Sequence, residues 1–308
     1  MENVFHLNPL NARSSRGDRN PMRDFVSIVK LEARILFELG TTDRYIMGNK
    51  KRKALKNRVN LQWWSYPSDG LQNVGDLLSP VVVDCILKNK GLSLESRCAR
   101  TSNLVAIGSV LGNYAQKAVV WGSGAFSSST NRRLKMSKYD IRAVRGPLTR
   151  KTLIDHGHAD CPEVYGDPAI LLSEFYSPRK TEPRSFAVIE HYCHRVPGDY
   201  DRINPLVENG DWKSFVDRVC SCELVVSSSL HGIILAETYG VPAVWLASPQ
   251  SDSYSFKYED WYLGTGRRPP NPAQSVSEAL RMAPPQLPNL NHNRAALMET
   301  FPYELWLN

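Results

Sequence analysis

Residues 222–246 constrain the fold of this chain more than any other segment, because a strand, a helix and a second strand follow one another directly in it. Cys222–Val226 is a short apolar run typical of a buried parallel strand. Ile233–Tyr239 reads as a helix that ends at Gly240, and Val241–Leu246 reads as the next strand. Parallel strands need a crossover of this kind, so the segment predicts a βαβ unit within an α/β fold.

The same alternation of apolar runs and helical patterns extends over most of the chain, with further apolar runs at residues 104–108, 118–122, 140–145 and 185–190. It predicts an α/β protein with two Rossmann-like, doubly wound domains that face a cleft, which suits the length of 308 residues. We expect a helical, basic N-terminal extension at residues 1–60, α/β domains at 61–176 and 177–290, and a tail at 291–308 that packs back on the first domain.

The formal net charge of +7 favours an anionic partner without choosing among nucleic acid, anionic lipid and a phosphorylated substrate. The six cysteines contain no C-x-x-C pair, which is typical of reduced thiols in a cytosol and argues against structural zinc. No run of 18 apolar residues occurs, and residues 1–19 are too polar for a secretory signal. We therefore expect a cytoplasmic protein.

Much of the positive charge lies in residues 49–58, which contain six basic residues and no acidic one. One interpretation is a solvated helix face, since charge runs of this length are usually exposed. The other is docking on an anionic membrane, helped by the apolar residues at 25–31 and by Trp63 and Trp64. Nucleic-acid binding is not expected, because no aromatic and basic interleaving accompanies the run.

His231 stands where the predicted strand ends and the predicted helix begins, within Ser227–Gly232. Ligands of such sheets bind beyond the carboxyl ends of the strands, and free N–H groups at a helix start attract anions. A histidine there either hydrogen-bonds a neighbour or changes protonation as an anionic substrate binds, which suits a general acid. Ser228 and Ser229 are interpreted as capping or anion-binding hydroxyls, because no G-x-S-x-G elbow is present.

Two further charged residues lie at predicted helix starts. Arg145 precedes Gly146 and Pro147, and its planar guanidinium suits either a substrate carboxylate or phosphate, or a surface salt bridge. Asp76 follows Asn73, Val74 and Gly75, where it either caps the helix or holds or deprotonates a sugar hydroxyl.

Three other segments are candidate ligand contacts. Gly122, Ser123 and Gly124 follow a strand and allow a ligand to approach the backbone, although a tight turn explains them nearly as well. His191 and Tyr192 end another strand and are expected along the cleft wall. Metal binding there is not expected, because histidines so close in sequence have poor geometry for joint coordination. Lys257 is either a ligand contact or an ordinary exposed lysine.

Taken together, these residues resemble the polysaccharide pyruvyl transferase family, and are especially similar to its xanthan ketal pyruvate transferase type. The similar segments keep one order between about residues 63 and 306: Asn73–Ser79, Val120–Gly124, Val144–Pro147, Glu163–Pro168, Ser227–Gly232, Phe256–Asp260, Gly264–Arg267 and Phe301–Trp306.

The resemblance implies a fold like that of GT-B glycosyltransferases, with the first α/β domain on the acceptor side and the second on the donor side. It implies phosphoenolpyruvate as donor, no other cofactor and no metal, and a terminal hexose, expected on a lipid-linked oligosaccharide, as acceptor. The product is a cyclic pyruvate ketal, and phosphate is released. A peripheral position at the inner face of the cell membrane is compatible with such an acceptor.

The resemblance also implies roles for individual residues. His231 is the expected acid and Asp76 the candidate residue for orienting the acceptor. The expected donor-binding residues are Arg145, Lys257, Ser228, Ser229, Gly232 and Arg267, and the expected acceptor-binding residues are Asn73, Gly75, Gly122, Ser123, Gly124, His191 and Tyr192. Some relatives carry arginine where this chain has Ser229, and Arg267 or Arg268 is the proposed replacement.

Two other functions stay open at this point. A nucleotide-sugar-dependent glycosyltransferase on the same fold would bind a sugar nucleotide and would not respond to phosphoenolpyruvate. A non-catalytic, membrane-docked protein of polysaccharide assembly would not need His231 for polymer pyruvylation.

Overall fold

The computed structural model describes residues 56–65, 70–113, 117–128, 132–179, 181–248 and 255–307. The chain divides into two compact units, residues 1–43 and 44–308, and all described residues belong to the second. The predicted helical extension therefore lies outside the described residues up to residue 55, as does the basic run except for residues 56–58.

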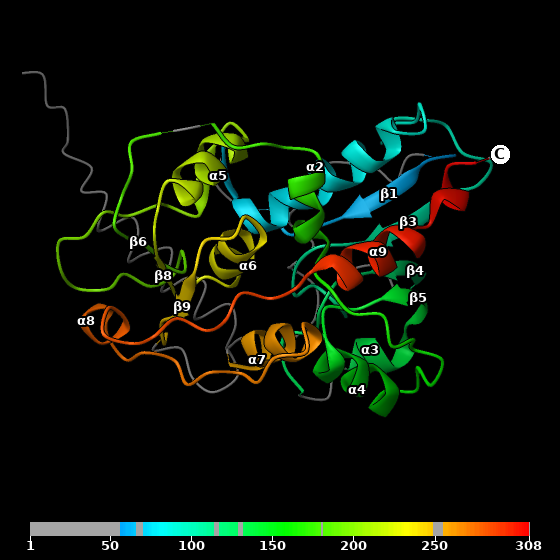
Figure 1. The fold of residues 1–308 in the computed structure, drawn as a ribbon. Helices are drawn as coiled ribbons and strands as arrows, with labels where there is room; N and C mark the ends of the chain where they lie inside the picture. The colour runs from blue at the N-terminus through cyan, green and yellow to red at the C-terminus, as the bar shows by residue number, and fades with distance from the viewer. Residues whose placement is uncertain are drawn as a thin grey trace, which may run out of the picture. The chain divides into compact units, whose positions relative to one another are not determined.

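The first half of this unit contains a four-stranded parallel sheet with the strand order β1-β3-β4-β5 (Figure 1). Its strands are β1 (Val59–Gln62), β3 (Ser102–Val105), β4 (Lys117–Trp121) and β5 (Lys138–Ala143). In β4 every residue after Lys117 is buried, as expected for a strand covered on both faces. The predicted apolar runs at 104–108, 118–122 and 140–145 thus contain strand residues.

The second half contains a three-stranded parallel sheet in which β8 is central, with the order β6-β8-β9. Its strands are β6 (Ala187–Ile189), β8 (Val225–Ser227) and β9 (Ala243–Trp245). A small antiparallel pair links the halves, because β2 (Leu71–Asn73) pairs with β7 (Leu206–Glu208). The backbone N–H of Val74 extends this link by donating to the carbonyl of Pro205 (2.8 Å).

The helices connect the strands and cover the sheets. They are α2 (Val74–Lys88), α3 (Arg132–Met136), α4 (Pro147–Asp155), α5 (Trp212–Cys220), α6 (Leu230–Thr238), α7 (Ser255–Gly264), α8 (Val276–Ala279) and α9 (Asn291–Glu299), with 3-10 segments η1 (Pro168–Glu174) and η3 (Tyr303–Leu305). The N-cap of α2 is Asn73, whose Oδ1 accepts the N–H of Gly75 (3.0 Å). The interpretation of Asp76 as that cap was wrong, because Asp76 already lies inside the first turn.

The two sheets share one apolar core. A single cluster of buried side chains includes Leu78 of α2 and Ile107 from the first half, and Ile189 and Ile233 from the second. Helix α2 packs against β1 and also against α5 and α6, so it contributes to both sides of this core. The predicted α/β class with parallel sheets is confirmed. In both parallel sheets the described strands follow sequence order, so the doubly wound, cleft-facing, GT-B-like arrangement and the four domain ranges remain predictions.

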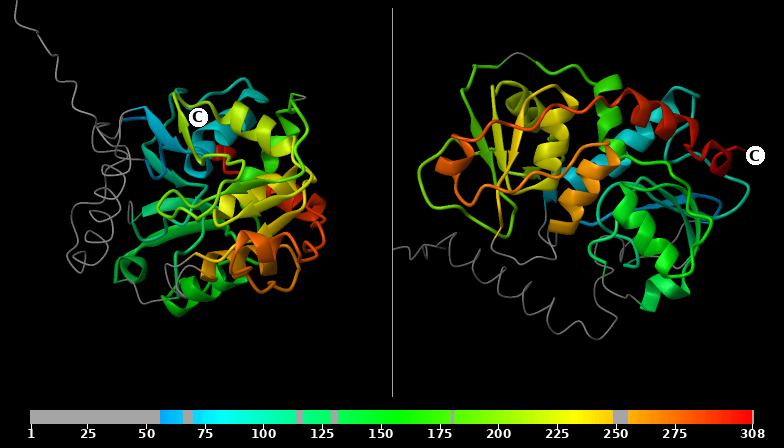
Figure 2. Two further views of the ribbon diagram at one scale, coloured as in Figure 1. Left: turned by 90° about the vertical axis from the view of Figure 1, so that its left-hand side faces the viewer. Right: turned by 60° about the horizontal axis from the view of Figure 1, so that its bottom comes forward.

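The C-terminal segment runs from α8, beside the three-stranded sheet, to α9, beside the four-stranded sheet (Figures 1 and 2). The indole N–H of Trp121 in β4 donates to the carbonyl of Leu297 in α9 (2.9 Å). Phe301 packs edge-on against Trp121, with 4.9 Å between ring centroids. These contacts hold the tail against the first sheet.

Candidate functional site

The turn between β8 and α6 presents His231 in the first turn of a helix. The sequence predicted a helix from Ile233, but α6 begins at Leu230 with Ser229 as N-cap. The Ser227 hydroxyl accepts the N–H of Ser229 (3.0 Å), and the Ser228 hydroxyl accepts the N–H of His191 (2.9 Å). The hydroxyl of Ser229 makes no cap hydrogen bond, so it does not accept from the first N–H groups of α6.

Packing restricts the first turn of α6 at Gly232. A Cβ there would lie 2.4 Å from Oγ of Ser227 and 2.9 Å from Ile189 of β6. Only a glycine allows the helix to start this close to the strand end. The structure therefore accounts for Gly232 by packing, and its predicted donor contact stays a prediction.

The imidazole of His231 lies between the two halves of the unit. Its Nε2 is 3.4 Å from Oδ2 of Asp167, which is ion-pair distance without hydrogen-bond geometry. On another side, a Cβ added to Gly75 would lie 1.9 Å from Nδ1 and 2.2 Å from Cγ of the ring. The start of α2 therefore forms a close support for the ring, and Gly75 is required there because it has no side chain.

Asp76 lies next to this support. A Cβ on Gly108, which follows β3, would lie 2.7 Å from Oδ1 of Asp76, so the carboxyl packs against that backbone. Burial raises the pKa of Asp76 from 3.8 to about 7, and the charge of Asp167 adds to the rise, whereas His231 and Lys257 oppose it. A carboxyl with this pKa exchanges protons near neutral pH.

Lys257 belongs to α7 and is buried, which excludes its interpretation as an ordinary exposed lysine. Burial lowers its pKa from 10.5 to about 8, and the nearby charge of Arg145 lowers it further, against the opposing effect of Asp76. Its Nζ lies 5.3 Å from the ring centroid of Tyr258, whose hydroxyl donates to the carbonyl of Ser228 (2.6 Å). Helix α7 is thereby fixed to the turn that carries His231.

Arg145 forms a buried ion pair rather than a surface salt bridge. Its Nε lies 3.1 Å from Oδ2 of Asp260, and the two side chains are 1% and 0% exposed. The two terminal nitrogens donate to Oγ of Ser109 (2.7 Å) and to the carbonyl of Ala125 (2.8 Å). The guanidinium thus joins the end of β5 to α7, and its predicted contact with the donor stays a prediction.

Gly122, Ser123 and Gly124 fit closely against protein atoms. A Cβ on Gly122 would lie 2.3 Å from Cδ of Pro168, and one on Gly124 would lie 2.2 Å from Cζ of Arg145. The Ser123 hydroxyl is buried and donates to the carbonyl of Gly108 (2.8 Å). Packing of the tight turn accounts for all three residues, and their acceptor contacts stay predictions.

An aromatic row joins the carboxyl ends of β1 and β6. Tyr192 stacks on Trp64 with 5.4 Å between ring centroids, and His191 stacks on Tyr192 at 4.5 Å. Burial holds the pKa of His191 well below its usual range, and the charge of Lys257 acts in the same direction. The neutral form of the imidazole is therefore favoured, and the place of His191 and Tyr192 along a cleft wall stays a prediction.

Arg267 lies away from His231. Its terminal nitrogens donate to both carboxylate oxygens of Glu237 (2.7 and 2.8 Å), and its guanidinium lies over the ring of Tyr262 (4.6 Å to the centroid). Glu237 is near the end of α6, about 9 Å along the helix from His231 at the usual rise per residue. The structure therefore accounts for Arg267 by its pairing with Glu237, and its predicted donor contact stays a prediction.

Three residues that shape the site were not among the predicted site residues: Asp167, Asp260 and Trp64. Asp167 precedes Pro168, a pattern that reads as an ordinary helix cap. Asp260 lies three residues after Lys257 in α7. Residues at this spacing are neighbours on one face of a helix, so the spacing is the signal that could have indicated Asp260. Trp64 was interpreted only as a membrane contact, whereas it lies just after the end of β1.

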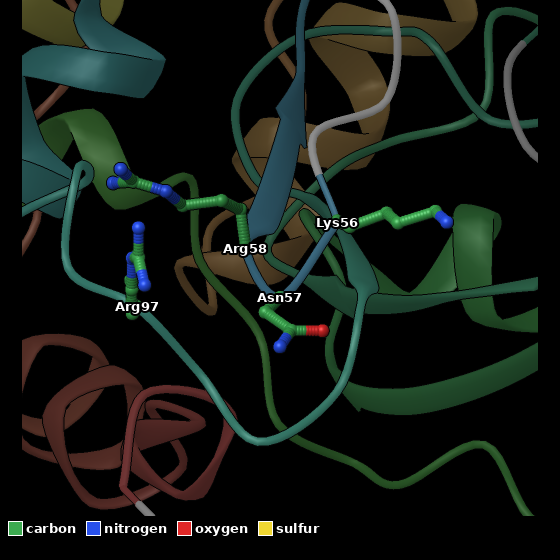
Figure 3. Close-up of a pocket in the computed structure, with 4 residues that line it drawn as sticks. All are labelled: Lys56, Asn57, Arg58 and Arg97. Atoms are coloured by element: carbon green, nitrogen blue, oxygen red, sulfur yellow. The ribbon is translucent and has the colours of Figure 1, made fainter.

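A basic pocket lies at the start of β1, at the sheet edge opposite the carboxyl ends of the strands. It has a volume of about 340 Å³ and is lined by Lys56, Asn57, Arg58 and Arg97. Figure 3 shows Arg58 and Arg97 extending to one side of the chain and Lys56 to the other. Arg58 also pairs with Glu95 at 3.4 Å. Among the residues described, none of the helices is long and apolar enough to cross a membrane.

The fold and the site define an α/β protein with a histidine, lysine and carboxylate centre at the carboxyl ends of its parallel strands. Residues 41–250 match the sequence model of the family described as polysaccharide pyruvyl transferase. The chain belongs to this family.

Two curated proteins show what the chain is similar to. Succinoglycan biosynthesis protein ExoV of Rhizobium meliloti (strain 1021) is 33% identical over 195 residues, which cover 58% of this chain and 59% of ExoV. The uncharacterized protein L143 of Acanthamoeba polyphaga mimivirus is 28% identical over 151 residues, which cover 46% of this chain and 51% of L143. The chain therefore spans little more than half the length of these relatives. No solved structure matches it.

Proposed function

We propose that this protein is a pyruvyltransferase that moves the carboxyethylidene group of phosphoenolpyruvate to two hydroxyls of a terminal hexose in an exopolysaccharide repeat unit. One observation carries the proposal: in a member of the polysaccharide pyruvyl transferase family, the buried carboxyl of Asp76 in α2 interacts electrostatically with both His231 of α6 and Lys257 of α7. The biosynthetic role in the name of ExoV supports an exopolysaccharide acceptor.

The donor reaction needs an acid and positive charge. His231 donates a proton to C3 of phosphoenolpyruvate, which makes C2 electrophilic, and the oxygen of one sugar hydroxyl forms a bond to C2. The bond between C2 and the phosphate oxygen then breaks, and phosphate leaves with that electron pair. Lys257 and the N–H groups at the start of α6 stabilise the carboxylate and the departing phosphate.

The acceptor reaction needs a base. Each of the two hydroxyls loses a proton as its oxygen bonds to C2, and the second bond closes the cyclic ketal. One proton restores His231 and the other leaves with the phosphate, so the reaction balances without a further reactant. Asp76, with a pKa of about 7, is suited to accept and release such a proton near neutral pH.

The test is incubation of the protein with phosphoenolpyruvate and a hexose-terminated lipid-linked oligosaccharide. We expect phosphate release together with a new ketal methyl signal in the proton spectrum, and loss of both in His231→Gln. Stabilisation by a sugar nucleotide but not by phosphoenolpyruvate would favour the glycosyltransferase alternative. Polymer pyruvylation that persists in cells carrying His231→Gln would favour the non-catalytic assembly protein.

We also propose that the acceptor is presented at an anionic membrane surface. The basic pocket of Lys56, Arg58 and Arg97 supports this, because clustered basic side chains attract anionic headgroups. Arg97→Glu is expected to weaken binding to phosphatidylglycerol vesicles relative to phosphatidylcholine vesicles. Arg281→Glu, at an exposed arginine outside the pocket, is the matched control. Equal weakening in both variants would contradict a specific role of the pocket.

A further inference from the structure

We propose that Asp167 is a positioning residue that holds the imidazole of His231 for proton transfer, an inference that rests on the proposed role of His231 as acid. Oδ2 of Asp167 lies 3.4 Å from Nε2 of His231, and the two side chains are 1% and 12% exposed. Within the described part of the chain, neither of these two atoms has a hydrogen-bond partner.

An unpartnered carboxylate oxygen at this degree of burial needs an explanation. Leaving a buried acceptor unsatisfied costs about 1–3 kcal/mol, and more if it is charged. The other oxygen of Asp167, Oδ1, accepts the N–H of Ala169 (3.0 Å) as the N-cap of η1. The cap therefore uses one oxygen and leaves the second facing His231.

The surroundings of Asp167 keep its carboxylate in place. Gly166 has a φ of +151°, and a Cβ on it would lie 2.9 Å from Cδ1 of Leu297 in α9. The ring of Pro168 fills the space that a Cβ on Gly122 would need. Both backbone neighbours of Asp167 are therefore packed tightly, so the carboxylate has little freedom to turn away from His231.

The imidazole is restricted on its other side by the backbone of Gly75. The ionisable groups that act on this region include Asp167, the N-cap of η1, together with Asp76 of α2 and Lys257 of α7. A carboxylate facing Nε2 favours the tautomer with its proton on Nε2. Nδ1 is then the nitrogen that exchanges a proton with substrate, and Asp167 fixes both the tautomer and the ring orientation.

Asp167→Asn tests this role because asparagine keeps an oxygen for the cap but loses the charge. We expect kcat to fall at least about 10-fold, with the KM for phosphoenolpyruvate within about 3-fold of wild type and an unchanged Tm. Asp211→Asn is the matched control, since Asp211 is also an aspartate N-cap, accepting the N–H of Ser214 (3.2 Å) at the start of α5. Its kinetics are expected to equal those of wild type.

A double-mutant cycle separates positioning from general damage. If Asp167 acts through His231, Asp167→Asn adds little further loss in a His231→Gln background. An equal fold loss in both backgrounds would overturn the proposal, because Asp167 would then act independently of the imidazole.

A second measurement decides the inference even if the proposed transfer is absent. In protein labelled with ¹⁵N-histidine, the His231 signals are identified by their loss in His231→Gln. We expect wild type to show the tautomer protonated at Nε2 and Asp167→Asn to change the ring-nitrogen shifts. Unchanged His231 shifts would refute the contact, whereas failure of pyruvyl transfer in wild type would refute only the proposed function.

Discussion

Replacing Gly75 by alanine, beside a matched control, should separate the chemistry of the site from the stability of the fold. A Cβ at residue 75 would lie 1.9 Å from Nδ1 of His231, whereas real Cβ atoms keep at least 3.0 Å from their neighbours. The ring must therefore move by at least about 1.1 Å. A misplacement of about 1 Å in a reacting group costs about 100-fold in rate, or about 3 kcal/mol.

The same substitution also has a cost in stability. Alanine is favoured over glycine in the first turn of α2 by up to about 1 kcal/mol, but the added Cβ overpacks the ring of His231, which costs about 1–3 kcal/mol. We expect Gly75→Ala to lower kcat for phosphoenolpyruvate-dependent phosphate release about 100-fold, with unfolding stability lowered by about 1–2 kcal/mol. Kinetics within about 3-fold of wild type would refute the reasoning that the Gly75 backbone supports the imidazole.

Gly210→Ala is the matched control, because it should lower stability by a similar amount without moving His231. Gly210 has a φ of +75°, which an alanine tolerates poorly, but a Cβ there would meet nothing within 4 Å. The backbone strain should lower stability by about 1 kcal/mol without changing kcat. A loss of activity in both variants would point to general destabilisation instead of displacement of His231.

Three further perturbations address the pH dependence, the ion pair and the aromatic row. Asp76→Asn removes a carboxyl whose pKa rises from 3.8 in the unfolded chain to about 7 in the fold, so that wild type loses stability as pH rises between these values. The difference in Tm between the variant and wild type, measured by calorimetry, should therefore increase from about pH 4 to about pH 7. A difference that stays constant over this range would contradict the raised pKa. Arg267→Gln leaves the carboxylate of Glu237 buried without its ion pair and should lower unfolding stability by about 3 kcal/mol at an unchanged KM for phosphoenolpyruvate. A raised KM at unchanged stability would support Arg267 as a donor contact. Trp64→Ala removes the ring stacked on Tyr192 and should raise the KM for the acceptor up to about 10-fold, whereas an equal rise for phosphoenolpyruvate would argue against an acceptor-side role.

The sequence predicted what depends on local pattern. The apolar runs contain β6 and β9 and overlap β3, β4, β5 and β8, and Gly240, with a φ of +80°, follows α6 as expected. The start of α6 was predicted three residues late, because Leu230 and His231 precede the strongly apolar run. The sequence also indicated His231 and Asp76, since each lies at the start of a predicted helix.

Hydrophobic periodicity in the sequence did not predict contacts between residues that are distant in the chain. The support of the His231 ring by Gly75 and its pairing with Asp167 depend on packing of α2, η1 and α6 around one core. Arg267 is a further example, because the fold pairs it with Glu237, a contact that the sequence pattern did not predict, while its donor contact stays a prediction. Side-chain chemistry indicates what a residue is able to bind, and only the fold determines which partner reaches it.

The links between the two halves argue for a preorganised centre. The pairing of β2 with β7 ends directly at the first turn of α2, so it fixes Gly75 and Asp76 relative to the second half of the unit. On the other side of the centre, the buried ion pair of Arg145 and Asp260 fixes α7, which carries Lys257. Breaking that pair would leave an uncompensated buried charge, which costs about 3–5 kcal/mol. Groups held this firmly need little reorganisation when charge develops in a reaction, and electrostatic stabilisation is most effective under that condition.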